Sequence, residues 1–300
     1  MLEASTFWTT YKRGAGEIYN PIKALGITNV VLDFRTTSEE VAGFEQLLIK
    51  GTLEKVTGVF FPVPMPPGIA KEAFKEETIS FSDPEATGSI ERAIDRTFES
   101  RVRLKFDFVI VNLGAVEMNL ISRQLMLQYP AIIDSEIWKL RVKEMVKVRR
   151  ERRRKYLATA LKNLEKLLDR AQKEGVRVLI KNRLYYEEIP TFEETEVILE
   201  NFGGDVGFCY DVGYAKIQEN IKVAPHHLYW LHVFERYLDC VLLHDVNGVT
   251  PHLAPSSGEI DFLKITGYLK PSTHRVLHIG GDVKPVDAAR AKTYLEGLGF

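Results

Sequence analysis

Short apolar runs alternate with amphipathic stretches along the whole sequence. Eight of the runs are rich in β-branched and aromatic residues, which predicts strands. Some of them, such as VRVLI at 176–180, are apolar at nearly every position, as expected for parallel strands whose two faces are both buried. The predicted strands cover 2–8, 28–34, 55–63, 107–114, 176–184, 206–213, 239–246 and 275–281.

Helix-like stretches separate these strands. Eight strand–helix units predict a (β/α)8 TIM barrel that forms a single domain over residues 1–300. An open doubly wound sheet is the competing fold, but the sequence after the first strand lacks the glycine fingerprint that would favour it. The predicted helices cover 16–26, 38–51, 89–102, 191–204, 226–238, 260–270 and 285–299, with a longer helical segment, in one piece or two, at about 139–174.

The composition is that of an ordinary globular protein, with 45% hydrophobic and 27% charged residues. No apolar run approaches the roughly 20 residues of a membrane-spanning helix, and the N-terminus lacks a signal-peptide layout. The two cysteines, Cys209 and Cys240, are too few for a disulfide scaffold, so a reducing cytoplasmic location is expected. The net charge of −1 offers no general attraction for nucleic acid, which is a disfavoured partner.

Three segments between the regular elements have two interpretations each. The basic segment at 139–156 is either a solvated helix face or a contact for an anionic partner. The apolar segment at 113–138 folds over the barrel mouth or buries a partner surface, which makes a homodimer plausible. The proline-rich segment PVPMPPG at 62–68 forms a stiff rim or lid over the pocket, or a surface connector.

Polar residues end most of the predicted strands. A barrel of this kind carries its active site at the carboxyl ends of the strands, so these residues are the candidates for chemistry, although singly each is more often a loop contact. Three further histidines, His226, His227 and His232, lie in a predicted helix, where a surface or interhelical role is favoured over metal ligation. The strand-end residues are Asp33, Arg35, Asn112, Lys181, Asn182, Arg183, Asp211, Tyr214, His244, Asp245, Asn247, His278 and Asp282, with His252 in the loop after the seventh strand.

Several strand ends resemble motifs of the xylose isomerase-like TIM barrels. FCYDVGYA resembles their D-x-G-H-A segment after strand six, and VLLHDVNGVTPHLAPSSGEIDF resembles their H-x-x-D-x-x-G, D-x-H and G-x-G-x-I-D sequence around strand seven. VRVLIKN and VIVNLG resemble strands that end in Glu-Asn and His-Pro-Gly. The motifs occur in matching order over nearly the whole chain. This superfamily includes sugar and sugar-phosphate isomerases and epimerases and metal-dependent apurinic endonucleases.

The resemblance implies a divalent metal held by Glu, Asp, His and Glu at the ends of strands five to eight. The corresponding residues here are Lys181, Asp211, His244 and His278. Tyr214 replaces the histidine that usually follows the strand-six aspartate, while His252 of the D-x-H motif is retained. A protonated lysine has no lone pair for a metal and carries the same sign of charge.

Four interpretations of this altered site remain open. Lys181 forms an ion pair with Asp211 in place of the metal. Asp211, His244 and His278 form a facial site for Zn, Mn or Fe, which requires Lys181 to turn away. Lys181 acts as a base or Schiff-base nucleophile. Finally, Lys181, Arg183 and Arg35 bind an anionic substrate group while His244 or His278 transfers protons without a metal.

The resemblance therefore predicts an isomerase-, epimerase- or lyase-type enzyme for a small polyhydroxylated or phosphorylated substrate, with a degenerate or absent metal site. The cofactor is left open between a divalent metal and none. A non-catalytic ligand-binding or assembly protein is the alternative, and an apurinic endonuclease is disfavoured because its metal chemistry needs the lost ligands. The predicted catalytic residues are His244, His278 and Lys181, and the predicted substrate-binding residues are Arg35, Asn112, Asn182, Arg183, Tyr214 and His252.

Overall fold

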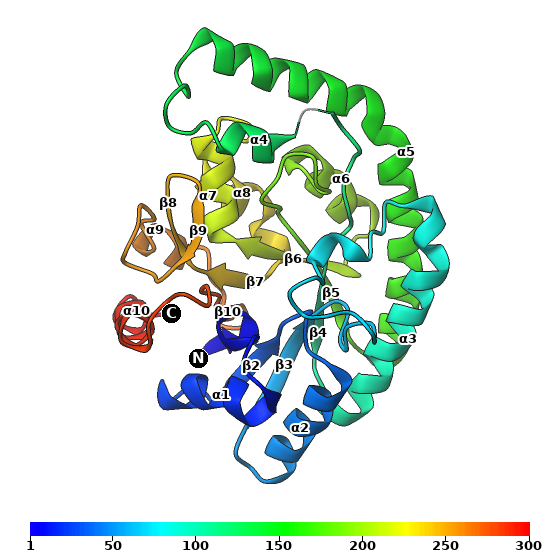
Figure 1. Ribbon diagram of the computed structural model, residues 1–300, viewed down its shortest axis with the longest axis vertical. Coiled ribbons are helices and arrows are strands. Elements are labelled where there is room, and N and C mark those ends of the chain that lie inside the picture. Colours follow the sequence, from blue (N-terminus) through cyan, green and yellow to red (C-terminus); the bar gives the residue numbers. More distant parts are fainter. Residues whose placement is uncertain (120) are drawn as a thin grey trace.

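The computed structural model describes residues 1–119 and 121–300, and its centre is a closed barrel of parallel strands (Figure 1). Around the barrel the strands follow the order β1-β10-β7-β6-β5-β4-β3-β2. The predicted TIM barrel is confirmed, and every predicted strand is present within a few residues of its expected position. The barrel strands are β1 (Leu2–Ser5), β2 (Asn29–Leu32), β3 (Lys55–Phe60), β4 (Phe108–Val111), β5 (Arg177–Lys181), β6 (Val206–Asp211), β7 (Leu238–Leu243) and β10 (His274–Leu277).

Helices surround the barrel, and local sequence signals set many of their ends. Thr37 and Thr191 each form a capping box with a glutamate three residues later, and Gly175 ends the longest helix in the left-handed conformation. The helices are α1 (Gly14–Ala24), α2 (Ser38–Ile49), α3 (Thr87–Leu104), α4 (Ser122–Met126), α5 (Glu136–Glu174), α6 (Phe192–Asn201), α7 (Val212–Asn220), α8 (His227–Phe234), α9 (Leu263–Thr266) and α10 (Pro285–Gly297), with 3-10 turns at Thr6–Thr9, Glu76–Thr78, Pro84–Ala86 and Glu235–Tyr237.

Two features were not predicted from the sequence. Helix α7 starts directly after β6, with no loop between them, and the segment after β7 forms a small antiparallel hairpin of β8 (Asp245–Asn247) and β9 (Thr250–Leu253). Both lie at the carboxyl end of the barrel. They bring Tyr214 and His252 next to the strand-end residues, which the order of the sequence alone does not establish.

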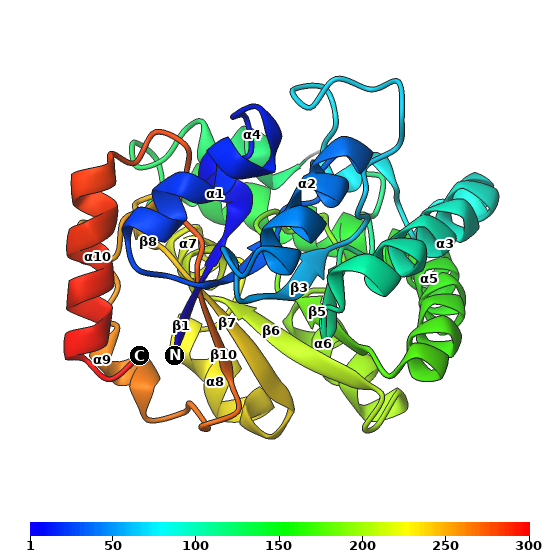
Figure 2. The ribbon, with the colours of Figure 1, turned by 90° about the horizontal axis from the view of Figure 1, so that it is seen from below.

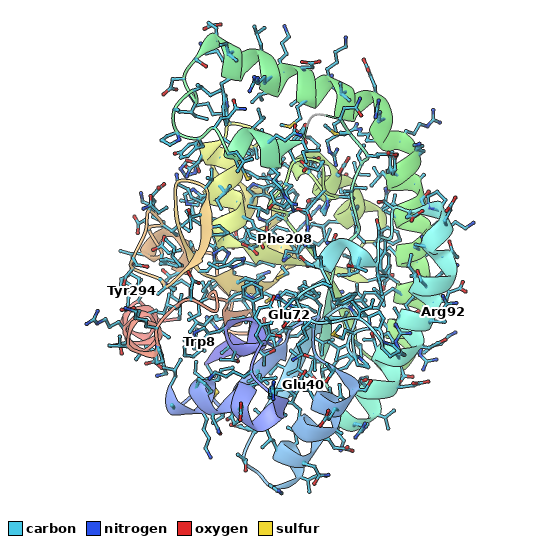
Figure 3. The ribbon with its side chains drawn as sticks, in the orientation of Figure 1. Trp8, Glu40, Glu72, Arg92, Phe208 and Tyr294 are labelled. Atoms are coloured by element: carbon cyan, nitrogen blue, oxygen red, sulfur yellow. The ribbon has the colours of Figure 1, made fainter. Side chains whose placement is uncertain are left out.

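The barrel interior and the layer around it are closely packed. A Cβ atom on Gly58 would lie 2.1 Å from Cε2 of Phe108, so glycine on β3 makes room for a large ring from the neighbouring strand. On the outside of β6, Phe208 stacks on Trp230 of α8 with ring centroids 6.2 Å apart. Figure 3 shows Phe208 in the interior of the molecule and Arg92 on the outer side of α3. Burial of apolar area therefore fixes the scaffold that carries the site.

The connections at the carboxyl end of the strands form a cover over the barrel. The β3–α3 connection and α4 lie at this end, as Figure 2 shows from a second direction. Lys71 of the β3–α3 connection binds Glu40 at 2.5 Å and the carbonyl of Thr10 at 2.8 Å, which ties the connection to α2 and to the turn after β1. The backbone N–H of Met65, in the proline-rich segment, donates to the carbonyl of Thr36 at 2.8 Å, so hydrogen bonds hold this segment in place as well.

Helix α5 contains the basic segment, and one of its cations is structural. Arg149 is 1% exposed, and its guanidinium makes two hydrogen bonds to Glu194 at 2.6 and 2.8 Å and a third to the carbonyl of Glu188 at 2.9 Å. Trp138 of the same helix is buried and donates its indole N–H to the carbonyl of Ile221 at 3.2 Å. The basic helix is therefore docked on the barrel by buried polar contacts as well as apolar ones.

Arg149→Met should destabilise the fold by about 3–5 kcal/mol, because it leaves the buried carboxylate of Glu194 without its partner. The double variant Arg149→Met, Glu194→Gln should lose less than the single variant, since Gln keeps the size of the side chain without its charge. Urea unfolding of the three proteins measures this. Lys139→Met, which removes an exposed ion pair with Glu136, serves as the control and should change little. Equal losses for single and double variants would contradict the buried-pair argument.

Candidate active site at the carboxyl end of the barrel

Lys181, the last residue of β5, is enclosed at the carboxyl end of the barrel. Its side chain is 2% exposed, and its Nζ lies 3.5 Å from Oε1 of Glu76 and 3.8 Å from Oδ2 of Asp211. The same ammonium lies over the rings of Phe60 and Tyr214, 5.4 and 5.0 Å from their centroids. The predicted ion pair with Asp211 is present, but it is shared with a second carboxylate from the β3–α3 connection.

The two residues after Lys181 fix the neighbouring strand ends. Asn182 accepts from the backbone N–H of Asp211 at 2.7 Å and donates to its carbonyl at 2.9 Å, so both ends of the amide are committed to the backbone. Arg183 makes a bidentate contact with Glu76 at 2.9 and 2.8 Å and binds Glu188 at 2.7 Å. Lys181 thus points into the site, and Asn182 joins β5 to β6. Arg183 joins the β3–α3 connection to the loop after β5.

A chain of hydrogen bonds links Tyr214, His252, His244 and Asp211. The Tyr214 hydroxyl lies 3.1 Å from Nε2 of His252, and the backbone N–H of His252 donates to Nδ1 of His244 at 2.9 Å. Nε2 of His244 lies 2.8 Å from Oδ1 of Asp211. The close packing depends on Gly213, where a Cβ atom would lie 2.0 Å from Cε1 of His244.

These contacts determine the tautomers of two imidazoles. Nδ1 of His252 lies 3.3 Å from the carbonyl of His278, which only accepts, so this nitrogen carries the proton and Nε2 accepts from Tyr214. Nδ1 of His244 accepts from a backbone N–H, so its Nε2 carries the proton and donates to Asp211. Both ring nitrogens of His244 are therefore engaged.

Three buried polar atoms at this end of the barrel have no hydrogen-bond partner within the described part of the chain. They are Nδ1 of His278, Oδ2 of Asp211 and Nδ2 of Asn112. The ring of His278 is packed against Phe60, Phe7 and two other imidazoles, and its centroid is 5.2 Å from that of Phe60. An unpartnered buried polar atom costs about 1–3 kcal/mol, so each of the three is a candidate to bind a ligand or water.

The surrounding charges set the protonation of the site. Burial, followed by His252 and Lys181, lowers the pKa of His278 well below its usual value. Burial and His244 likewise lower the pKa of His252 to about 3. Burial raises the pKa of Asp211, but His244 and Lys181 outweigh it and the net shift is downward. At neutral pH, His252 and His278 are therefore neutral and Asp211 is ionised.

Arg35 is less available to bind a substrate anion than its position in the sequence suggests. Its guanidinium binds Asp33 at 2.7 and 3.2 Å and contacts the hydroxyl of Tyr11. It also lies over the rings of Phe7 and Phe34 at 5.0 and 4.6 Å. The residue has a neutralising partner and a structural position at the rim, as Arg183 does.

The donor set does not fit a divalent metal. The ammonium of Lys181 is paired with Oδ2 of Asp211, the oxygen that does not bind His244, and an ammonium offers no lone pair to a metal. Within the described residues, the donor atoms of Asp211, His244 and His278 do not all come within 4.8 Å of one another. A facial metal site required Lys181 to turn away, whereas the side chain is almost fully buried between Glu76 and Asp211.

Glu76 and Glu188 are parts of the site that sequence reasoning missed. Glu76 lies in a long connection without periodic pattern, and Glu188 lies in the loop after β5. The sequence offers one signal for these glutamates. Lys181 and Arg183 end a predicted buried strand, and two buried cations require carboxylates nearby. Burial raises the pKa of Glu76, but Arg183 and Lys181 together lower it to about 2.

Solved structures share this fold over nearly the whole chain. A D-tagatose 3-epimerase-like protein aligns with a TM-score of 0.67 at 13% identity, over 99% of this chain and 96% of that one. The 3-keto-D-glucoside 4-epimerase of E. coli aligns with a TM-score of 0.67 at 15% identity, over 99% and 98% of the two chains. A putative xylose isomerase from Rhodospirillum rubrum aligns with a TM-score of 0.69 at 12% identity, over 99% and 98%.

These likenesses confirm the fold that the sequence resemblance predicted, that of the xylose isomerase-like sugar epimerases and isomerases. No protein-family model matches the sequence, and a search of curated protein sequences finds no match. Among the described residues, no helix is both long and apolar enough to cross a membrane. At these identities the comparisons establish the fold, and the chemistry has to be argued from the residues of the site.

Glu76→Gln should destabilise the protein most at neutral pH and progressively less in acid. The Glu76 carboxyl has a pKa of about 2 when folded against an ordinary 4.5, so its ion pairs stabilise the fold above about pH 4.5 and are lost as pH falls towards 2. The difference in unfolding free energy between wild type and variant should be on the order of 3 kcal/mol at neutral pH.

Urea unfolding between about pH 7 and about pH 3 measures this difference. Glu72→Gln, an exposed glutamate of the same connection, is the matched control and should show no such pH-dependent gap. A gap between wild type and Glu76→Gln that stays constant over the whole range would contradict the ion-pair geometry.

Proposed function

We propose that the chain is an isomerase- or epimerase-type enzyme that moves a proton on a small polyhydroxylated carbonyl compound without a metal. One observation carries the proposal: a neutral, buried imidazole, His278, has an unpartnered ring nitrogen and shares the Phe60 ring with the ammonium of Lys181. Support for the substrate class comes from the structural neighbours, which are sugar epimerases and isomerases.

His278 is the better candidate for the base than His244. Both nitrogens of His244 are engaged, whereas Nδ1 of His278 has no partner within the described chain. In the proposed reaction, Nδ1 of His278 takes the proton from a carbon next to the substrate carbonyl, and the C–H electron pair moves to form an enediolate. Return of the same proton to the neighbouring carbon, while the hydroxyl proton moves to the other oxygen, gives the isomer. The epimer forms when a water molecule protonates the opposite face and the His278 imidazolium releases its proton to solvent.

Lys181 supplies the positive charge that such a reaction needs. The ammonium is held 3.5 and 3.8 Å from its two carboxylates, longer than the about 2.7–3.2 Å of an ordinary N–H···O hydrogen bond. Its donors can therefore turn to an oxygen that becomes negative during the reaction. This contribution is essential, because the low pKa of His278 keeps the imidazole unprotonated but makes it a weak base.

The charge balance favours an uncharged substrate over the anionic one expected from the sequence. Arg183 is saturated by Glu76 and Glu188, and Arg35 is bound to Asp33. The cations that were predicted to bind a phosphate are therefore already neutralised by carboxylates. Hydroxyl groups, in contrast, match Oδ2 of Asp211, which accepts no hydrogen bond although Lys181 lies 3.8 Å away, and Nδ2 of Asn112, which donates none.

His278→Gln and Lys181→Met should each slow solvent proton exchange by at least about 100-fold, as expected for loss of a proton-transfer group or of an oxyanion donor. Chelator-treated protein is incubated in D2O with tagatose, allulose, ribulose and xylose, and NMR follows deuterium at the carbon next to the carbonyl. His232→Gln and Lys162→Met, at exposed positions, are the matched controls.

Two outcomes would contradict the proposal. Exchange that appears only after a divalent metal is added would show that the metal, and not Lys181, carries the chemistry. Sugar binding detected by calorimetry with no exchange in wild-type protein would instead favour the non-catalytic ligand-binding alternative.

A further inference from the structure

A cluster of two histidines and a glutamate lies outside the barrel site, where α7 ends and α8 begins. Glu219 lies in the last turn of α7, His226 precedes α8, and His227 is its first residue. One ligand atom from each of the three side chains lies within 4.8 Å of those of the other two. Two imidazoles and one carboxylate are a donor set that suits zinc and other borderline divalent transition metals.

The positions of the three side chains are set by contacts that also orient their donor atoms. Nδ1 of His227 lies 2.6 Å from Oε2 of Glu219, and the backbone N–H of His227 donates to the same oxygen at 2.8 Å. The His227 side chain is 9% exposed, and its Nε2 has no hydrogen-bond partner in the described part of the chain. The contact with Glu219 therefore orients this ring.

His226 completes the cluster from the solvent side. Its ring stacks on His227 with centroids 4.6 Å apart, and its Nε2 lies 4.0 Å from Oε1 of Glu219. The side chain is 61% exposed, so a metal ion can reach the cluster without opening the fold. Its Nδ1 accepts a long hydrogen bond from the backbone N–H of Leu228 at 3.3 Å. A metal on Nε2 would break this bond, because the ring proton would then lie on Nδ1.

We propose that Glu219, His226 and His227 form a surface site for a divalent transition metal such as zinc, with water at the remaining position. The ion replaces the proton between Nδ1 of His227 and Glu219 and draws Nε2 of His226 inward. Lys216 opposes binding, because its ammonium lies 3.0 Å from Oε1 of Glu219. The site joins α7 to α8 and is separate from the barrel residues of the proposed reaction.

The test is calorimetric titration of the untagged, chelator-treated protein with ZnCl2, with the visible spectrum of bound Co2+ as a second readout. One equivalent should bind, and the melting temperature should rise with zinc concentration. His226→Ala and Glu219→Gln should each weaken binding by at least about 10–100-fold, the range seen even when a residue supporting a ligand is removed.

Matched variants distinguish metal binding at this site from binding to any exposed histidine and from binding in the barrel. His232→Ala, an exposed histidine of the same helix, should leave the affinity unchanged, and Lys216→Gln should increase it by removing the competing cation. Equal affinity in wild type, His226→Ala and Glu219→Gln would overturn the proposal. If binding is instead lost in Asp211→Asn, the metal lies in the barrel, which overturns both this inference and the metal-free reaction.

Discussion

The ammonium of Lys181 lies in the interior of a barrel, between the carboxylates of Glu76 and Asp211, and a charge in that position has to be compensated locally. The compensation extends outward, because Glu76 also binds Arg183, and Arg183 binds Glu188. A loop that follows β3 and a loop that follows β5 are thereby fixed over the same strand end. The enclosed cation thus determines both the electrostatics of the site and the shape of its cover.

The same cation contributes to the neutral state of two histidines. Burial is the largest cause that lowers the pKa of His252 and of His278, a neighbouring imidazole comes next, and Lys181 adds to both shifts. Lys181 carries the positive charge of this cluster. His252 and His278 are neutral, so each keeps a lone pair on one ring nitrogen. Because hydrogen bonds engage both nitrogens of His244, the arrangement leaves His278 as the ring whose Nδ1 has no partner among the described residues.

The strands and their terminal residues were predictable because both follow from local sequence: apolar runs mark the strands, and the first polar residue marks their ends. Three features depend on contacts between distant segments and were not predictable. Glu76 reaches the site from a connection with no periodic pattern. Asp211 is the last residue of β6 and also the N-cap of α7, so no loop signal separates strand from helix. Arg149 is buried on Glu194, although its neighbours in the sequence form an exposed basic run.

A covalently attached cation constrains the site differently from a bound metal. A metal can be lost and replaced, and its ligands must be acidic or neutral, whereas Lys181 is always present and its neighbours have to balance it permanently. Lys181 and Arg183 face Asp211, Glu76 and Glu188, so the local formal charge is already −1 before any ligand enters. A neutral ligand leaves this balance intact, but an anionic one must displace a buried carboxylate or bring its own cation. For the proposed reaction, the electrostatics of the enclosed lysine therefore favour an uncharged substrate over an anionic one.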